Sequence, residues 1–182
     1  IHFVPECKSC TKCVSMRIDV KNFQFSKSQK RVLNKNKDTK VFIRPPTVTK
    51  EHMDLYHKYH TIMQDKKDWK LKVLGNGPLK EQLQNHDDIK VIDFVQPEEF
   101  ENIIKQSGCL LLPSIKEPWA LVLHEFSAAG LPIIASNVCG SIPYFLINGY
   151  NGFVFENKNF NDLKQKMEKV IQLSDSELFR MS

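Results

Sequence analysis

Two glutamates eight residues apart have the types and spacing to bind a hydroxylated substrate. Glu117 precedes a helix that we expect over 121–129, and Glu125 lies about two turns into it. A carboxylate accepts two hydrogen bonds from neighbouring hydroxyls of a ribose or hexose. The orphan backbone amides that begin the helix, those of residues 120–122, suit a phosphate group. Spacing by itself favours a simpler interpretation, a first-turn charge and a second charge on a solvated helix face.

Two glycines lie between an expected strand and an expected helix. Gly75 and Gly77 follow the apolar run 71–74 and precede a helix that begins at Leu79. Glycine permits tight turns and close approach of the backbone to a ligand. The alternative is an ordinary strand–helix turn.

Three cysteines lie close together near the start of the chain. Cys7, Cys10 and Cys13 have the spacing that wraps an iron–sulfur cluster or supplies zinc ligands. A closed site wants a fourth ligand, for which His2 is the candidate. Three reduced cysteines near the edge of a core are the alternative.

A strongly basic stretch covers residues 21–40. Asp38 is its only acid, and Phe23 and Phe25 alternate with the cations. This pattern suits a phosphate backbone such as that of RNA, and a solvated basic helix face fits the composition equally well. The cations are Lys21, Lys27, Lys30, Arg31, Lys35, Lys37 and Lys40.

The composition is that of an ordinary globular protein, with 182 residues, 41% hydrophobic and 26% charged. It contains no apolar run of membrane-spanning length and no signal-peptide pattern, so we expect a cytoplasmic protein without a membrane span. The net charge of +5 divides unevenly, as +8 over residues 1–69 and −3 over 70–182. Such a change of sign favours two bodies with different partners, and a single domain with one basic face is the alternative.

The elements that must position these residues change character at about residue 70. Short apolar runs then alternate with amphipathic helices, which predicts parallel βαβ units and a doubly wound α/β sheet. In such a sheet ligands bind beyond the carboxyl ends of the strands. Residues 1–69 read as a small, incomplete α+β segment, in which a short strand at 41–43 is stopped by Pro45 and Pro46.

The second segment also matches a known family in the order of its motifs. The matching stretches are 69–79, 112–114, 117–125 with its Glu-x7-Glu motif, 129–135, Gly140 and 148–153. Residues 70–168 thus resemble the C-terminal half of the family-4 retaining glycosyltransferases, whose GT-B fold has two Rossmann-like domains. The resemblance implies a nucleotide-diphosphate sugar as ligand and a reaction that requires no metal or other cofactor.

The same resemblance implies roles for individual residues. Glu117 would face the donor hexose near the reaction centre and is the catalytic candidate. Glu125 would hold the ribose hydroxyls, and the amides of Leu121 and Val122 would meet the diphosphate. Gly75 and Gly77 complete the expected substrate-binding set.

This chain departs from that family at several positions. Ala120 and Asp93 stand where the family has glycine. The family's diphosphate-neutralising Arg and Lys would come from residues 1–69, which do not match them, and its acceptor-binding domain is absent. Without those cations the departing diphosphate loses electrostatic stabilisation, so we do not expect an autonomous glycosyltransferase.

The first segment matches a different family. Residues 3–20, which include the three cysteines, and 23–36 and 55–69 resemble the bacterial aspartate/glutamate leucyltransferases, which are aminoacyl-tRNA–protein transferases. The resemblance implies transfer of an amino acid from tRNA to an acidic protein N-terminus. It also implies a metal or cluster site at the cysteines. The block Ser28, Gln29, Lys30 and Arg31 would contribute to tRNA recognition.

Together these observations predict a composite of two incomplete transferases. The proposed division is 1–69 and 70–182, and no Gly/Ser/Pro linker separates the two parts. One alternative is a true fusion, in which the tRNA-linked segment modulates the sugar-nucleotide domain. Others are a leucyltransferase and a non-catalytic binding module.

Overall fold

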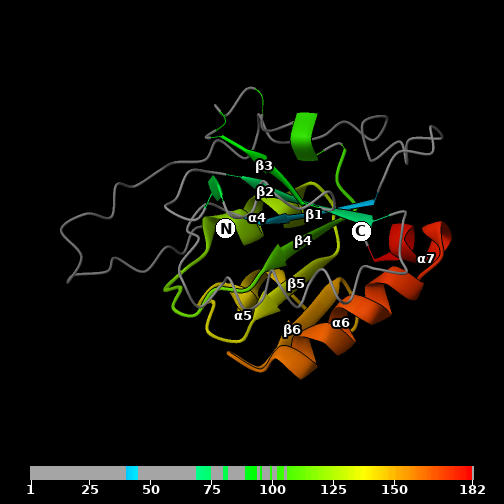
Figure 1. Ribbon diagram of the computed structural model, residues 1–182. Coiled ribbons are helices and arrows are strands. Elements are labelled where there is room, and N and C mark those ends of the chain that lie inside the picture. The colour runs from blue at the N-terminus through cyan, green and yellow to red at the C-terminus, as the bar shows by residue number, and fades with distance from the viewer. Residues whose placement is uncertain are drawn as a thin grey trace.

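The computed structural model describes one parallel sheet and the helices that cover it. Described are the backbone of residues 40–44, then 69–74, 80–81, 89–93, 95, 99, 102–104 and 106–181. The strands are β1 (Lys40–Arg44), β2 (Trp69–Leu74), β3 (Ile89–Ile92), β4 (Cys109–Leu112), β5 (Ile133–Ser136) and β6 (Gly152–Phe155). They lie in the order β3-β2-β1-β4-β5-β6, and every neighbouring pair is parallel (Figure 1).

The expected α/β fold with a parallel sheet is confirmed, and the sheet begins earlier in the chain than we expected. Strand β1, which precedes residue 70, lies between β2 and β4. Its residues pair with β2 from Lys40 opposite Trp69 to Arg44 opposite Val73. Sequence patterns show where a strand forms but not which distant strand becomes its neighbour, so the expectation of a sheet from residue 70 on missed a central strand.

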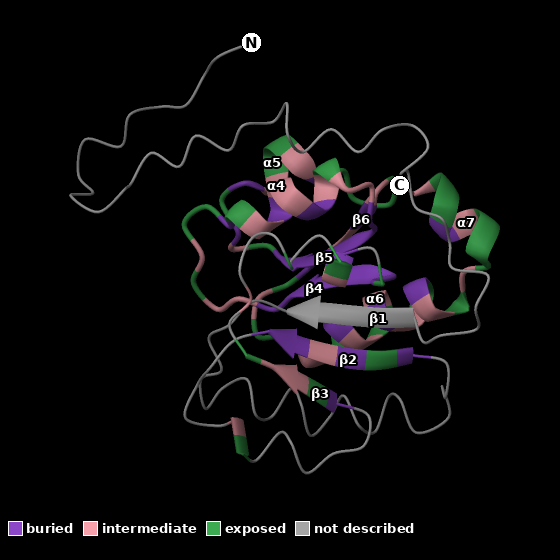
Figure 2. Ribbon diagram, turned by 90° about the horizontal axis from the view of Figure 1, so that it is seen from above, coloured by how far each residue is buried: buried purple, intermediate pink, exposed green. Residues whose placement is uncertain are grey.

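The sheet separates two apolar cores because successive side chains of a strand point to opposite faces. Helix α4 (Leu121–Ala128) covers one face through Leu123 and Phe126, both fully buried. Helices α6 (Phe160–Gln172) and α7 (Asp175–Arg180) cover the other face. Strands β4 and β5 are buried along their whole length, as their colour in Figure 2 shows. This two-sided burial explains why both strands read as continuous apolar runs.

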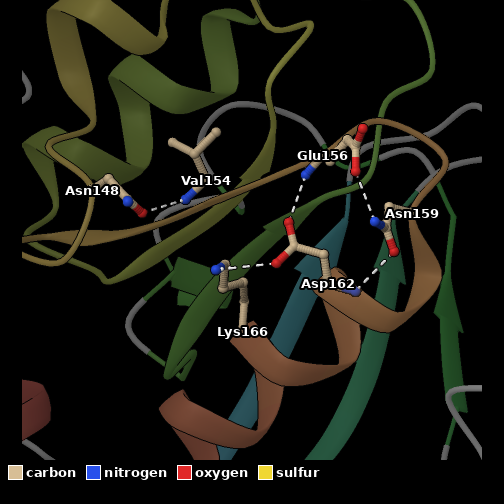
Figure 3. Close-up of polar contacts among 6 residues, drawn as sticks. All are labelled: Asn148, Val154, Glu156, Asn159, Asp162 and Lys166. Carbon is tan, nitrogen blue, oxygen red and sulfur yellow. Dashed lines mark hydrogen bonds and ion pairs between the residues drawn. The ribbon is translucent and has the colours of Figure 1, made fainter.

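Polar side chains fix the start of α6 (Figure 3). Asn159 caps the helix by accepting a hydrogen bond from the amide of Asp162 at 3.1 Å. The Asp162 carboxylate accepts a bond from the amide of Glu156 at 2.8 Å and pairs with Lys166 at 3.1 Å. The hydrogen bond from Glu156 is the main cause that holds the pKa of Asp162 below its ordinary value. These contacts fix the turn by which β6 enters α6.

The short helix α5 (Ile142–Phe145) leads into a turn built by two asparagines. Asn151 accepts a hydrogen bond from the Ile147 amide at 2.7 Å and donates one to the Phe145 carbonyl at 2.9 Å. Asn148 accepts a bond from the amide of Val154 at 2.9 Å (Figure 3). In this structure both asparagines of the 148–153 motif therefore shape the backbone before β6.

Candidate functional site

The candidate site lies at the edge of the sheet where the parallel strands end. Glu117 lies five residues after the last residue of β4, and α4 begins four residues later. Gly75 and Gly77 follow the end of β2 in the chain, but both lie outside the described residues. The structure therefore brings the predicted catalytic residue Glu117 and two of the predicted substrate-binding residues, Leu121 and Val122, to one edge.

The Glu117 carboxylate bonds to the backbone that begins α4. Its Oε1 accepts a hydrogen bond from the Ala120 amide at 3.0 Å and a longer one from the Trp119 amide at 3.4 Å. We expected the Ala120 amide to be free for a ligand, and this expectation was wrong because Glu117 already occupies it. The amides of Leu121 and Val122 have no acceptor among the described residues. They remain the donors available to an anion.

Ala120 has an unusual backbone conformation. Its φ is 71° and its ψ is 73°, in the left-handed region, and it is the N-cap of α4. An L-residue with a Cβ adopts this conformation at a cost of about 1–2 kcal/mol, whereas glycine adopts it freely. The family has glycine at this position, and glycine would adopt the conformation without strain. The structure adds backbone strain at this position.

A second loop holds the segment 117–120 in place. The amide of Gly140 donates to the Glu117 carbonyl at 3.1 Å, and the amide of Ser141 donates to the Trp119 carbonyl at 3.0 Å. Ser141 also donates through Oγ to the Ala120 carbonyl at 3.2 Å. A Cβ on Gly140 would overlap the Pro118 carbonyl, so only glycine allows the two loops this close.

Sequence reasoning missed the part that this second loop plays. Gly140 carried a signal, because it belongs to the motifs that match the glycosyltransferase family. Ser141 carried none, because its partner Ala120 lies 21 residues away in the chain.

Glu125 lies in the second turn of α4 and is half-buried. Burial raises the pKa of its carboxyl above the ordinary value. A charge on a fully solvated helix face would not be desolvated in this way. The simpler interpretation of this residue as a solvated charge is therefore incomplete.

Cys139 lies in the loop between β5 and α5, next to the backbone of Glu117. Its thiol is buried, and Glu117 and Cys139 form an isolated parallel bridge through their backbones. Burial, aided by the Glu117 carboxylate, raises the pKa of the Cys139 thiol to about 12, against a hydrogen bond with Ser114 that lowers it. The thiol is therefore protonated at neutral pH and is not a nucleophile in this environment.

The remaining predicted residues belong to the first segment. Cys7, Cys10 and Cys13, and the block Ser28 to Arg31, lie outside the described residues. Within the described part of the chain, no three His, Cys, Asp or Glu side chains gather in a way that could hold a metal ion. No helix in that part is long and apolar enough to cross a bilayer.

Comparison with known families assigns the chain to a protein family. The sequence model of "Glycosyl transferases group 1" matches residues 24–180, most of its length. The chain belongs to this family. The group 1 glycosyl transferase match overlaps a second one, because residues 1–31 match "Arginine-tRNA-protein transferase, N terminus". Both predicted resemblances are confirmed, and the family match extends well before residue 70.

Relatives of both kinds are found among known proteins. The aspartate/glutamate leucyltransferase of Campylobacter jejuni is 52% identical over 66 residues, which are 36% of this chain and 28% of the relative. An uncharacterized glycosyltransferase of Methanocaldococcus jannaschii is 30% identical over 119 residues, covering 62% of this chain and 33% of the relative. The chain thus spans about a third or less of each relative's length.

A solved structure has the same fold as this group 1 glycosyl transferase chain. A mutant of TarM from S. aureus, in complex with fondaparinux, alpha-GlcNAc-glycerol and UDP, superposes with a TM-score of 0.67. The two sequences are 16% identical, and the match covers 79% of this chain and 30% of TarM. The likeness establishes a GT-B-type half for this chain.

Proposed function

We propose that this chain binds a nucleotide-diphosphate sugar, the donor of a retaining glycosyl transfer, at the carboxyl edge of its sheet. The observation that carries the proposal is the tied loop between β4 and α4. It presents an acidic side chain, Glu117, beside two helix-start amides without an acceptor, those of Leu121 and Val122. The family match over 24–180 and the UDP bound to the structural relative support the same ligand class.

Each group has a chemical task that suits this ligand. The Leu121 and Val122 amides meet the diphosphate, because unpaired amides and the helix dipole both favour anions. The half-buried Glu125 carboxylate accepts hydrogen bonds from the ribose hydroxyls. Glu117, held through Oε1, presents its other oxygen to the hexose near the reaction centre. We assign no metal to this site, since these groups bind the ligand through hydrogen bonds.

The position of β1 supports a candidate for the cation that the diphosphate needs. Arg44 is the last residue of β1, which pairs with both β2 and β4. It is the only charged residue that ends a described strand at the carboxyl edge of the sheet. From this backbone position we propose that Arg44 neutralises part of the phosphate charge.

Calorimetric titration of the full chain with UDP, GDP and ADP and with their glucose conjugates tests the proposal. We expect one nucleotide to bind, and its affinity to fall about tenfold in Glu125→Gln and in Arg44→Gln, since a charged hydrogen bond is worth about 1.5–3 kcal/mol. Glu168→Gln, on the surface of α6 and paired with Lys164, is the matched control and should bind as the parent does. If no nucleotide binds, the proposal is wrong.

A second candidate function rests on the leucyltransferase relative. A 52% identity over 66 residues favours a tRNA contact by the basic segment 21–40. The alternative activity, transfer of an amino acid from tRNA to an acidic protein N-terminus, comes from the same relative. Affinity for tRNA should fall steeply with salt, because several Lys and Arg replace counterions on the phosphates.

Cys10→Ser, compared with the parent for bound iron and zinc, tests the proposed site at Cys7, Cys10 and Cys13, and equal metal contents would refute it.

A further inference from the structure

Ser141 fixes the two peptide groups on either side of Ala120. It is a fully buried residue directly before α5. Its amide holds the Trp119 carbonyl at 3.0 Å, and its Oγ holds the Ala120 carbonyl at 3.2 Å. The orientations of these two peptide groups define φ and ψ of Ala120, so one serine determines the backbone conformation there.

The conformation that Ser141 determines is a strained one. An alanine at a φ of 71° persists only where its surroundings over-determine it. The same strained residue joins the two parts of the proposed site. On its N-terminal side its amide bonds to Glu117, and on its C-terminal side the amides of Leu121 and Val122 follow at once.

We propose that Ser141 is a positioning residue of the nucleotide-sugar site, which keeps Ala120 left-handed and thereby holds Glu117 and the α4 amides in register. The inference rests on the proposed function. Ser141 touches no ligand in this role and acts only through the backbone. Its contribution therefore depends on the strain at position 120, which a purely stabilising hydrogen bond would not.

The first test compares two buried serines in the full chain, with UDP as the probe. Ser141→Ala should weaken UDP binding about fivefold, the equivalent of one net hydrogen bond. Ser136→Ala is the matched control, because Ser136 is equally buried and its hydroxyl has no hydrogen-bond partner among the described residues. This control should bind UDP within twofold of the parent chain.

The second test repeats the substitution in an Ala120→Gly background. Glycine adopts the left-handed conformation without strain, so Ser141→Ala should then weaken UDP binding less than about twofold. If Ser141→Ala alone does not fold, the double variant Ala120→Gly/Ser141→Ala tests the inference in its place. It must fold and bind UDP within twofold of Ala120→Gly.

Each contrary outcome has a distinct meaning. Three outcomes would overturn the inference about Ser141 without touching the proposed function. They are an equal loss of UDP affinity in the two backgrounds, unchanged UDP binding in Ser141→Ala, and a double variant that fails to fold. Failure of the unsubstituted chain to bind UDP or any other nucleotide would overturn the proposed function, and this inference with it.

Discussion

The Glu117 carboxylate accepts a hydrogen bond from the Ala120 amide at 3.0 Å, so the first acid of the Glu-x7-Glu motif is tied to the N-cap residue of α4. The orientation of this carboxylate is therefore set within the protein before any ligand arrives. Such preorganisation lowers the entropic cost of ordering the side chain upon binding. It also means that changes to the loop backbone reach the acid directly.

Ala120→Gly should stabilise the fold. Glycine removes the left-handed strain of about 1–2 kcal/mol and loses part of that gain to its larger backbone entropy, which leaves a net gain of about 0.5–1 kcal/mol. Ala128→Gly, at the exposed end of α4, is the matched control and should destabilise by a similar amount. Urea unfolding of both variants measures whether each change raises or lowers the free energy of unfolding. A lower value in Ala120→Gly would contradict the strain at position 120.

Gly140→Ala should be more harmful than Gly149→Ala. A Cβ on Gly140 overlaps the Pro118 carbonyl and must separate the two loops, at a cost of about 1–3 kcal/mol or more. A Cβ on Gly149 meets nothing, and only its φ of 83° opposes alanine, at about 1 kcal/mol. Chemical denaturation ranks the two. Because only Gly140 abuts the site, only its substitution should also weaken UDP binding.

Glu125→Gln should raise stability at neutral pH. Burial raises the folded-state pKa of Glu125 above the unfolded value, so the folded state binds more protons between these two pKa values. Stability therefore falls as the pH rises through this window, and it stays lower above it. Thermal unfolding between pH 4 and pH 7 should show a smaller fall in the variant than in the parent chain.

The same variant distinguishes two roles for Glu125. If Glu125 is kept for ligand binding, replacing its carboxylate stabilises the fold but weakens binding. Glu125→Gln should then be more stable than the parent chain and bind the nucleotide less tightly. Glu168→Gln should change stability by no more than about 0.5 kcal/mol. If Glu125→Gln binds nucleotides as tightly as the parent chain does, the Glu125 carboxylate does not contribute to nucleotide binding.

A truncation tests the division proposed at residue 70. The fragment 70–182 lacks β1 and leaves β2 and β4 without the strand that joins them. Unpaired strand edges and a broken core predict that it does not unfold cooperatively. The fragment 32–182 removes the transferase-like match at 1–31 but retains β1, and it should unfold cooperatively by circular dichroism. Cooperative unfolding of 70–182 would support an independent second domain.

Much of the fold could be predicted because local signals coincide with its elements. The apolar run 109–112, which Pro113 ends, forms β4, and the amphipathic sequence that follows the Asn159 cap forms α6. The chain's final helix is separate, because Ser174 starts a capping box with Glu177. The break before it has no proline or glycine to mark it in the sequence.

The candidate site also has a part that the sequence predicts and a part that it does not. The places of Glu117, Leu121 and Val122 at the strand ends follow from sequence, because the topology of parallel sheets dictates them. The bond that consumes the Ala120 amide and the clamp by Ser141 do not follow from it. Both depend on contacts between loops whose approach is fixed only when β4 and β5 lie side by side.

The central place of β1 has a consequence for the newly made chain. β1 leaves the ribosome before either neighbour, yet its backbone pairs with β2 and with β4, which ends at Leu112. Until synthesis has passed that residue, at least one edge of β1 lacks its native neighbour. Synthesis of roughly 5–20 residues per second makes this a delay of several seconds, during which the nascent strand is exposed to wrong pairing or needs a chaperone.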